Sequence, residues 1–105
     1  MSEVVAPSLR ALAEATIAKL SDVVAAGTAT VTDWSRDGIP FAAVDGETLE
    51  VRLALPVAHA ALRTPDTEPS RRGADWVRFI PVVLDQYAAD RAAAWIESAW
   101  RNAVS

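Results

Sequence analysis

The run TLEVRLAL, residues 48–55, constrains this chain most, because a large apolar side chain occurs at every second position along it. Side chains expected to face the core occur at every second position: Leu49, Val51, Leu53 and Leu55. Those expected to face outward lie between them: Thr48, Glu50 and Arg52. A period of two residues is the period of a β-strand. One apolar face and one polar face indicate an antiparallel sheet that is covered on one side and wet on the other.

Two Asp-Gly pairs, Asp37-Gly38 and Asp45-Gly46, precede this run at the spacing expected for tight turns between strands. We therefore expect strands at residues 28–34, 39–44 and 48–55, which form a three-stranded meander. The aromatic, β-branched segment WVRFI, residues 76–80, predicts a fourth strand that Pro81 ends.

Apolar residues at helical spacing predict a first helix over residues 8–26, with Gly27 placed to end it. Pro56 is expected to open a short helix over residues 57–62. Asp85 is expected to cap a last helix that continues to about Ala103.

The predicted order of elements is α-β-β-β-α-β-α within a single domain, residues 1–105. Segregated strands that lack serial crossover helices favour the α+β class over α/β. We expect an antiparallel sheet of about four strands with the N- and C-terminal helices packed on one face. Just over half of the residues are hydrophobic, at 51%, which is enough for a core without disulfides.

The composition excludes several kinds of site. The chain has no cysteine and one histidine, His59, so thiol nucleophiles, thiolate metal sites and histidine-rich metal sites are not expected. The sequence has no EF-hand, Walker, GxGxxG or HExxH motif, so we predict no catalytic set, no metal and no cofactor. The net charge of −4 argues against general affinity for nucleic acid or anionic membranes. The lack of cysteines, of a signal-peptide pattern and of a long apolar run favours a cytoplasmic location without a membrane segment.

The segment RTPDTEPSRRGADWVRFI, residues 63–80, is the longest interval without a clear period before its final strand. Long irregular segments in small domains are often functional. Guanidinium groups beside an indole can bind a phosphate or carboxylate through paired hydrogen bonds and stacking. Five residues make up this predicted ligand-binding set: Arg52, Arg71, Arg72, Trp76 and Arg78.

Other interpretations of these residues stay open. The arginines can instead pair with the neighbouring carboxylates Asp66, Glu68 and Asp75 on a solvated surface. An enzyme that holds an anionic substrate on the arginines would need a general base, for which His59 is a candidate. A homodimer through an exposed strand or the last helix is a further alternative. We favour a binding or interaction module for an anionic small molecule or a protein partner.

The tryptophans are expected to serve the core and its rim. Trp95 falls on the apolar side of the last helix, whereas Trp100 falls at its edge, where it can cover the sheet or a partner. A ligand pocket walled by Trp34, Trp76 and Trp100 is the functional alternative.

The segments TLEVRLALP and DWVRF, with a short helix and a Pro/Arg/Gly loop between them and a Trp-bearing helix at the end, carry a resemblance. In this layout the chain resembles two groups of small bacterial proteins, the YjbR/MmcQ-like group and the "luciferase family" of small domains. The likeness covers residues 8–103 in layout and residues 49–79 in specific pattern. It implies the fold, and it brings no catalytic residue. The first group resembles a DNA-binding "double wing", a role against which the acidic net charge argues.

Overall fold

The computed structural model describes residues 8–104, and these residues form three helices and six strands. The helices are α1 (Leu9–Ile17), α2 (Leu55–Ala61) and α3 (Gln86–Asn102). The strands are β1 (Val23–Gly27), β2 (Val31–Arg36), β3 (Ile39–Asp45), β4 (Thr48–Arg52), β5 (Thr67–Pro69) and β6 (Trp76–Phe79).

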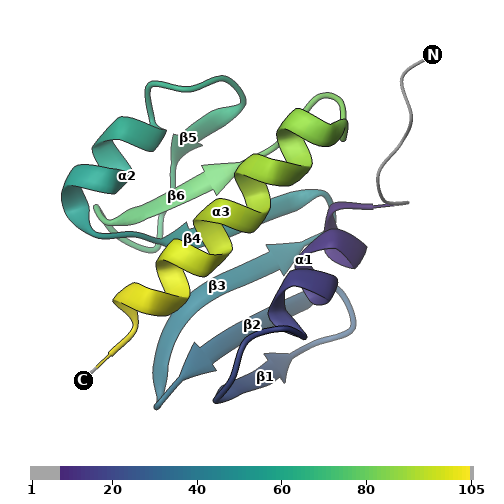
Figure 1. Ribbon diagram of the computed structural model, residues 1–105, viewed down its shortest axis with the longest axis vertical. Coiled ribbons are helices and arrows are strands. Elements are labelled where there is room, and N and C mark those ends of the chain that lie inside the picture. The colour runs from purple at the N-terminus through teal and green to yellow at the C-terminus, as the bar shows by residue number, and fades with distance from the viewer. Residues whose placement is uncertain (1–7, 105) are drawn as a thin grey trace.

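All six strands join one sheet in the order β1-β2-β3-β4-β6-β5, and every neighbouring pair is antiparallel (Figure 1). The predicted α+β class and antiparallel sheet are therefore confirmed. The predicted meander is present as β2, β3 and β4, joined by turns in which Asp37, Gly38 and Gly46 have positive φ. The count of about four strands was too low, since β1 and β5 extend the sheet at its two edges.

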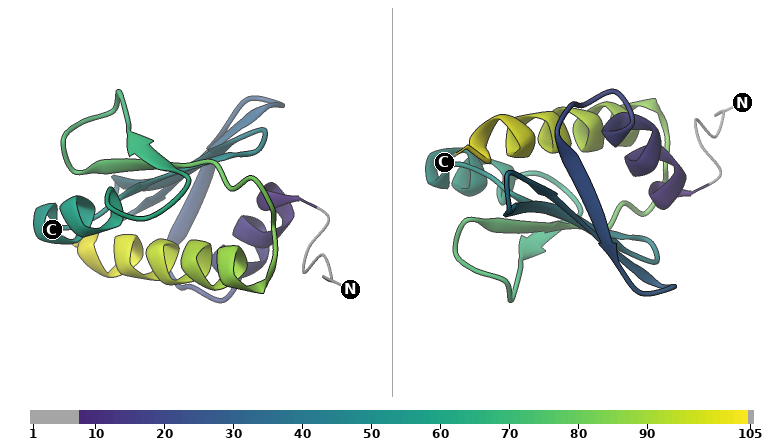
Figure 2. Two further views of the ribbon diagram at one scale, coloured as in Figure 1. Left: turned by 90° about the horizontal axis from the view of Figure 1, so that it is seen from above. Right: turned by 90° about the horizontal axis from the view of Figure 1, so that it is seen from below.

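Helices α1 and α3 lie on one side of the sheet and pack against each other and against β3 and β4 (Figure 2). The core between the helices and the sheet contains the inward side chains of β4 and β6, among them Leu49, Val51 and Phe79, each fully buried. Helices α1 and α3 each begin with a side-chain cap. Ser8 accepts a hydrogen bond from the backbone N–H of Ala11, and Asp85 accepts one from that of Ala88.

The first helix is shorter than predicted. It ends at Ile17, and Val23–Gly27 forms the edge strand β1 instead of two further helical turns. Asp22, just before β1, has φ +60°, a left-handed conformation that a continuous helix over residues 8–26 would not contain. The short apolar segment VVAAG suits either a helix or a strand by pattern alone, and its pairing with β2 decides the outcome.

The segment expected to be irregular holds a short strand. Thr67–Pro69 pairs with β6 as β5, so residues 67–79 form a hairpin whose turn carries Arg71 and Arg72. The third predicted strand also ends earlier than expected, at Arg52. Leu55 begins α2 and is 46% exposed, so its predicted place in the core was wrong. Pro56 fits the first turn of α2, where its missing N–H costs no hydrogen bond.

Candidate functional site: a charged row on the open face of the sheet

Helices α1 and α3 lie on the same side of the sheet, and neither covers the opposite face (Figure 2). The outward side chains of the strands point to that opposite face. Val77 and Phe79 of β6 belong to the core. Trp76 and Arg78 alternate with them along the strand and therefore point to the opposite face. The same alternation directs Glu50 and Arg52 of β4 outward. We call this surface the open face.

Strand register lines up the charged residues of the open face in one row. Asp33 of β2 lies opposite Ala43 of β3, which lies opposite Glu50 of β4. Glu50 lies opposite Arg78 of β6, and Arg78 lies opposite Glu68 of β5. Arg78 therefore stands between the carboxylates of Glu50 and Glu68 in the row. Opposite charges at such cross-strand positions attract each other.

Arg72 reaches this row from the β5–β6 turn. Its Nη2 lies 3.0 Å from Oδ1 of Asp33, and its Nε lies 3.1 Å from Oε1 of Glu50. Ala43 occupies the register position between these two carboxylates and is 2% exposed, although it lies on the open face. The guanidinium thus bridges the two carboxylates across a small residue that leaves room for it.

Trp76 lies against the same arginine. The guanidinium carbon of Arg72 is 5.1 Å from the centre of the indole ring, within cation–π range. Trp76 is 7% exposed, although it too faces away from the helices. Ser70 completes the cluster, because its hydroxyl bonds to Oε2 of Glu50 and accepts the backbone N–H of Arg72.

Two further ion pairs lie beside this cluster. Nη1 of Arg78 donates to Oε1 of Glu68 over 2.7 Å, and Nε of Arg52 donates to Oδ2 of Asp75 over 2.9 Å. All four carboxylate–guanidinium pairs are partly exposed to solvent, so each contributes modestly to stability.

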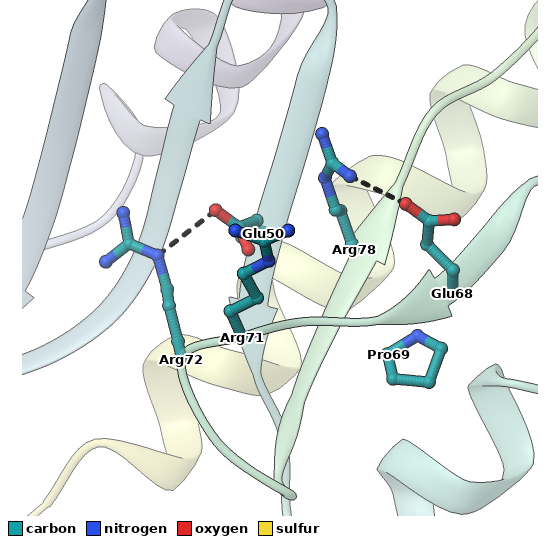
Figure 3. A pocket seen from close by; sticks show the side chains of 6 residues that line it. All are labelled: Glu50, Glu68, Pro69, Arg71, Arg72 and Arg78. Carbon is teal, nitrogen blue, oxygen red and sulfur yellow. Dashed lines mark hydrogen bonds and ion pairs between the residues drawn. The ribbon is translucent and has the colours of Figure 1, made fainter.

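A cavity of about 620 Å³ opens over the row, at the scale of small-molecule sites. Its lining residues are Glu50, Glu68, Pro69, Arg71, Arg72 and Arg78 (Figure 3). In the view of Figure 3, the side chain of Arg71 lies between those of Arg72 and Arg78. Arg71 is exposed and, within residues 8–104, forms no ion pair with a carboxylate, in contrast to Arg72 and Arg78.

The five residues of the predicted ligand-binding set are thus brought together in part. Arg71, Arg72 and Arg78 line one cavity. Trp76 lies beneath Arg72 and does not line that cavity, whereas Arg52 lines a second one of about 400 Å³ together with Asp75. The alternative interpretation was that the arginines pair with Asp66, Glu68 and Asp75. The structure shows such ion pairs for two of these carboxylates, Glu68 with Arg78 and Asp75 with Arg52.

Sequence reasoning missed Asp33 and Glu50 as partners of the arginines. Alternation along residues 48–55 did place Glu50 on the outward face, but it carries no information on which strand lies alongside. The order of strands across the sheet supplies that information, because β6 inserts next to β4.

His59 does not join the arginine site. It lies on α2, is exposed, and lines neither of the two cavities. Its neighbours on the helix, Ala58 and Ala61, are the residues that α2 buries in the core. The geometry therefore offers no support for His59 as a base acting on a substrate held by Arg71.

The tryptophans do not enclose one pocket. Trp34 belongs to the core on the helix side of the sheet, whereas Trp76 is on the open face. Trp100 covers the guanidinium of Arg36, whose carbon lies 4.0 Å from the ring centre, and its indole N–H donates to the carbonyl of Ser21. Trp95 packs edge-on against Phe79 at 5.1 Å between ring centres.

The charged groups named on the open face balance each other. Four carboxylates (Asp33, Glu50, Glu68 and Asp75) accompany four guanidiniums (Arg52, Arg71, Arg72 and Arg78). Nucleic-acid binding generally uses a basic surface, which this arrangement does not provide. Among residues 8–104, no group of three or more acidic or histidine side chains is placed to hold a metal ion. None of the helices in that range combines the length and apolar character needed to cross a bilayer.

No family model matches this chain, and comparisons with curated proteins and with solved structures give no match either. The resemblance to the YjbR/MmcQ-like and "luciferase family" groups stays a prediction.

Proposed function

We propose that the protein is a small binding module whose open-face cavity binds an anionic small molecule, with a carboxylate or phosphate group held by Arg71. The observation that carries this proposal is the grouping of three guanidiniums around one cavity, one of which has no carboxylate partner among the described residues.

Guanidinium N–H groups that take no part in the ion pairs support the proposal. Arg72 uses its Nε and Nη2 for Asp33 and Glu50, and Arg78 uses its Nη1 for Glu68. Within the described part of the chain, Nη1 of Arg72 and both Nε and Nη2 of Arg78 form no other hydrogen bond with protein groups. Among residues 8–104, no carboxylate pairs with Arg71, so its planar guanidinium can present two N–H donors to the two oxygens of a carboxylate or phosphate.

The carboxylates of the site have a definite role in this proposal. Glu50 and Glu68 orient the guanidiniums of Arg72 and Arg78, so a ligand meets donors that are already fixed in space. Preorganised donors lose less conformational entropy on binding. The same carboxylates repel a ligand of high negative charge, which favours a small anion over a polyanion.

The experiment is a titration of the protein with acetate, inorganic phosphate and a panel of metabolite carboxylates and phosphate monoesters, followed by amide and arginine side-chain NMR shifts. We expect shifts at Arg71, Arg72 and Arg78, and a change in Trp76 fluorescence. Arg71→Ala should raise the dissociation constant about tenfold or more, since hydrogen bonds to charged groups contribute about 1.5–3 kcal/mol.

The matched control is Arg63→Ala, which removes an exposed arginine that does not line the cavity. This variant should bind as the unmodified protein does. An absence of shifts at the cavity up to millimolar ligand, or equal weakening by both variants, contradicts the proposal.

A further inference from the structure

The two edges of the sheet differ in how they are protected. At one edge, β5 is three residues long and carries Glu68 and Pro69, features that discourage pairing with another strand. At the other edge, β1 is five residues long with the sequence VVAAG, and it has neither a charged residue nor a proline. Four of its five residues are exposed, and Val24 is 66% exposed.

Along β1, the backbone N–H and C=O groups of successive residues point alternately toward β2 and away from the sheet. The N–H of Thr28 donates to the carbonyl of Val31, directly across the turn between β1 and β2. Hydrogen-bonded pairs alternate with non-bonded ones along an antiparallel ladder. Counting back along the register, Ala26 and Val24 direct their backbone groups toward β2, whereas Val23 and Ala25 direct theirs away from the sheet.

We propose that β1 binds β1 of a second copy of this chain through the edge that no other strand of residues 8–104 covers. The two sheets then join edge to edge around a two-fold axis between the two Ala25 residues. In this pairing the backbone of Ala25 bonds with that of its counterpart, and Val23 bonds with Gly27 of the second copy. Each pair exchanges two N–H···O bonds. The proposal is independent of the anion site.

Three features of β1 suit a second copy of the same strand. The outward backbone groups of β1 are symmetric about Ala25, so the strand is complementary to itself when reversed, as a two-fold interface requires. On the open face, Val24 lies beside Ala26 of the second copy, so the most exposed valine of the strand gains an apolar neighbour. No like charges of β1 meet across the axis, because the strand has none.

The first test is self-association measured by sedimentation equilibrium over a concentration series that reaches millimolar protein, together with amide hydrogen exchange. We expect a dimer with protected amides at Val23 and Ala25 where dimer predominates, and exposed amides there on dilution. The amides of Val24 and Ala26 should be protected in both states, because they bond to β2. A protein that stays monomeric throughout overturns the proposal.

Ala25→Pro removes the outward N–H and leaves the bonds to β2 in place, since edge strands tolerate proline where the N–H faces solvent. The N–H of Ala25 in each copy is the donor in one of the two hydrogen bonds between the paired Ala25 residues, so the variant loses both bonds. Their loss should weaken self-association about thirtyfold. A dimer of unchanged affinity would show that the contact lies elsewhere.

A charge exchange keeps the test decisive should the proline variant fail to fold. Ala25→Lys and Ala25→Glu each place like charges opposite each other at the axis, so each alone should self-associate a few-fold more weakly than the unmodified chain. An equal mixture of the two should form a heterodimer, because opposite charges then face each other. Ala94→Lys, at an exposed position of α3, is the matched control and should dimerise normally. A mixture that associates no more tightly than either charged variant alone overturns the proposal.

Discussion

Arg71 and Arg72 are adjacent in the sequence and both exposed, yet the structure predicts opposite consequences for their removal. Arg72→Ala deletes the ion pairs with Asp33 and Glu50 and the contact with Trp76. Partly exposed ion pairs contribute about 0.2–1 kcal/mol each, and an exposed cation–π contact contributes about 0.5–1 kcal/mol. The expected loss in the free energy of unfolding is therefore about 1–3 kcal/mol. For a domain of this size, such a loss lowers Tm by roughly 5–15 °C.

Arg71→Ala deletes no interaction with a carboxylate within the described range, so the free energy of unfolding should change by less than about 0.5 kcal/mol. The assay is thermal and urea denaturation of both variants at low and high salt. The deficit of Arg72→Ala should shrink in high salt, because salt screens the ion pairs that the unmodified protein possesses. Its tryptophan emission should shift to the red as Trp76 loses its cover. Equal stability of the two variants would refute the bridging role of Arg72.

Two further predictions concern the scaffold. Phe79→Ala should lower the free energy of unfolding by about 3–5 kcal/mol, measured by urea denaturation, because Phe79 is fully buried and packs edge-on against Trp95; a loss below about 1 kcal/mol would contradict this packing. Gly27→Ala should destabilise by about 1–3 kcal/mol, since a β-carbon there would lie 2.1 Å from the carbonyl oxygen of Val31 and φ is +138°. Gly46→Ala should lower the free energy of unfolding by less than Gly27→Ala does, because Gly46 has a left-handed φ but open space around it. A larger loss for Gly46→Ala than for Gly27→Ala would show that the β1–β2 turn is not as tight as described.

Much of the fold follows from local pattern. Alternation along residues 48–55 and the Asp-Gly turns predict the antiparallel meander, and Ser8 and Asp85 mark where the first and last helices begin. These features act over a few residues, so a single sequence contains them. The segment VVAAG contains no such signal, because a short apolar run suits a helix or a strand equally well. Only the presence of β2 beside it turns it into β1.

The candidate site divides in the same way. The sequence by itself determined that Glu50, Arg52 and Arg78 point away from the core, because side chains on a strand alternate between its two faces. It did not determine which of them meet. The tertiary structure placed β6 between β4 and β5 and the β5–β6 turn over Ala43, and so brought Arg72 to Asp33 from 39 positions away in the chain. Contacts of this kind depend on strand order and register, which packing of the whole core fixes and no local pattern encodes.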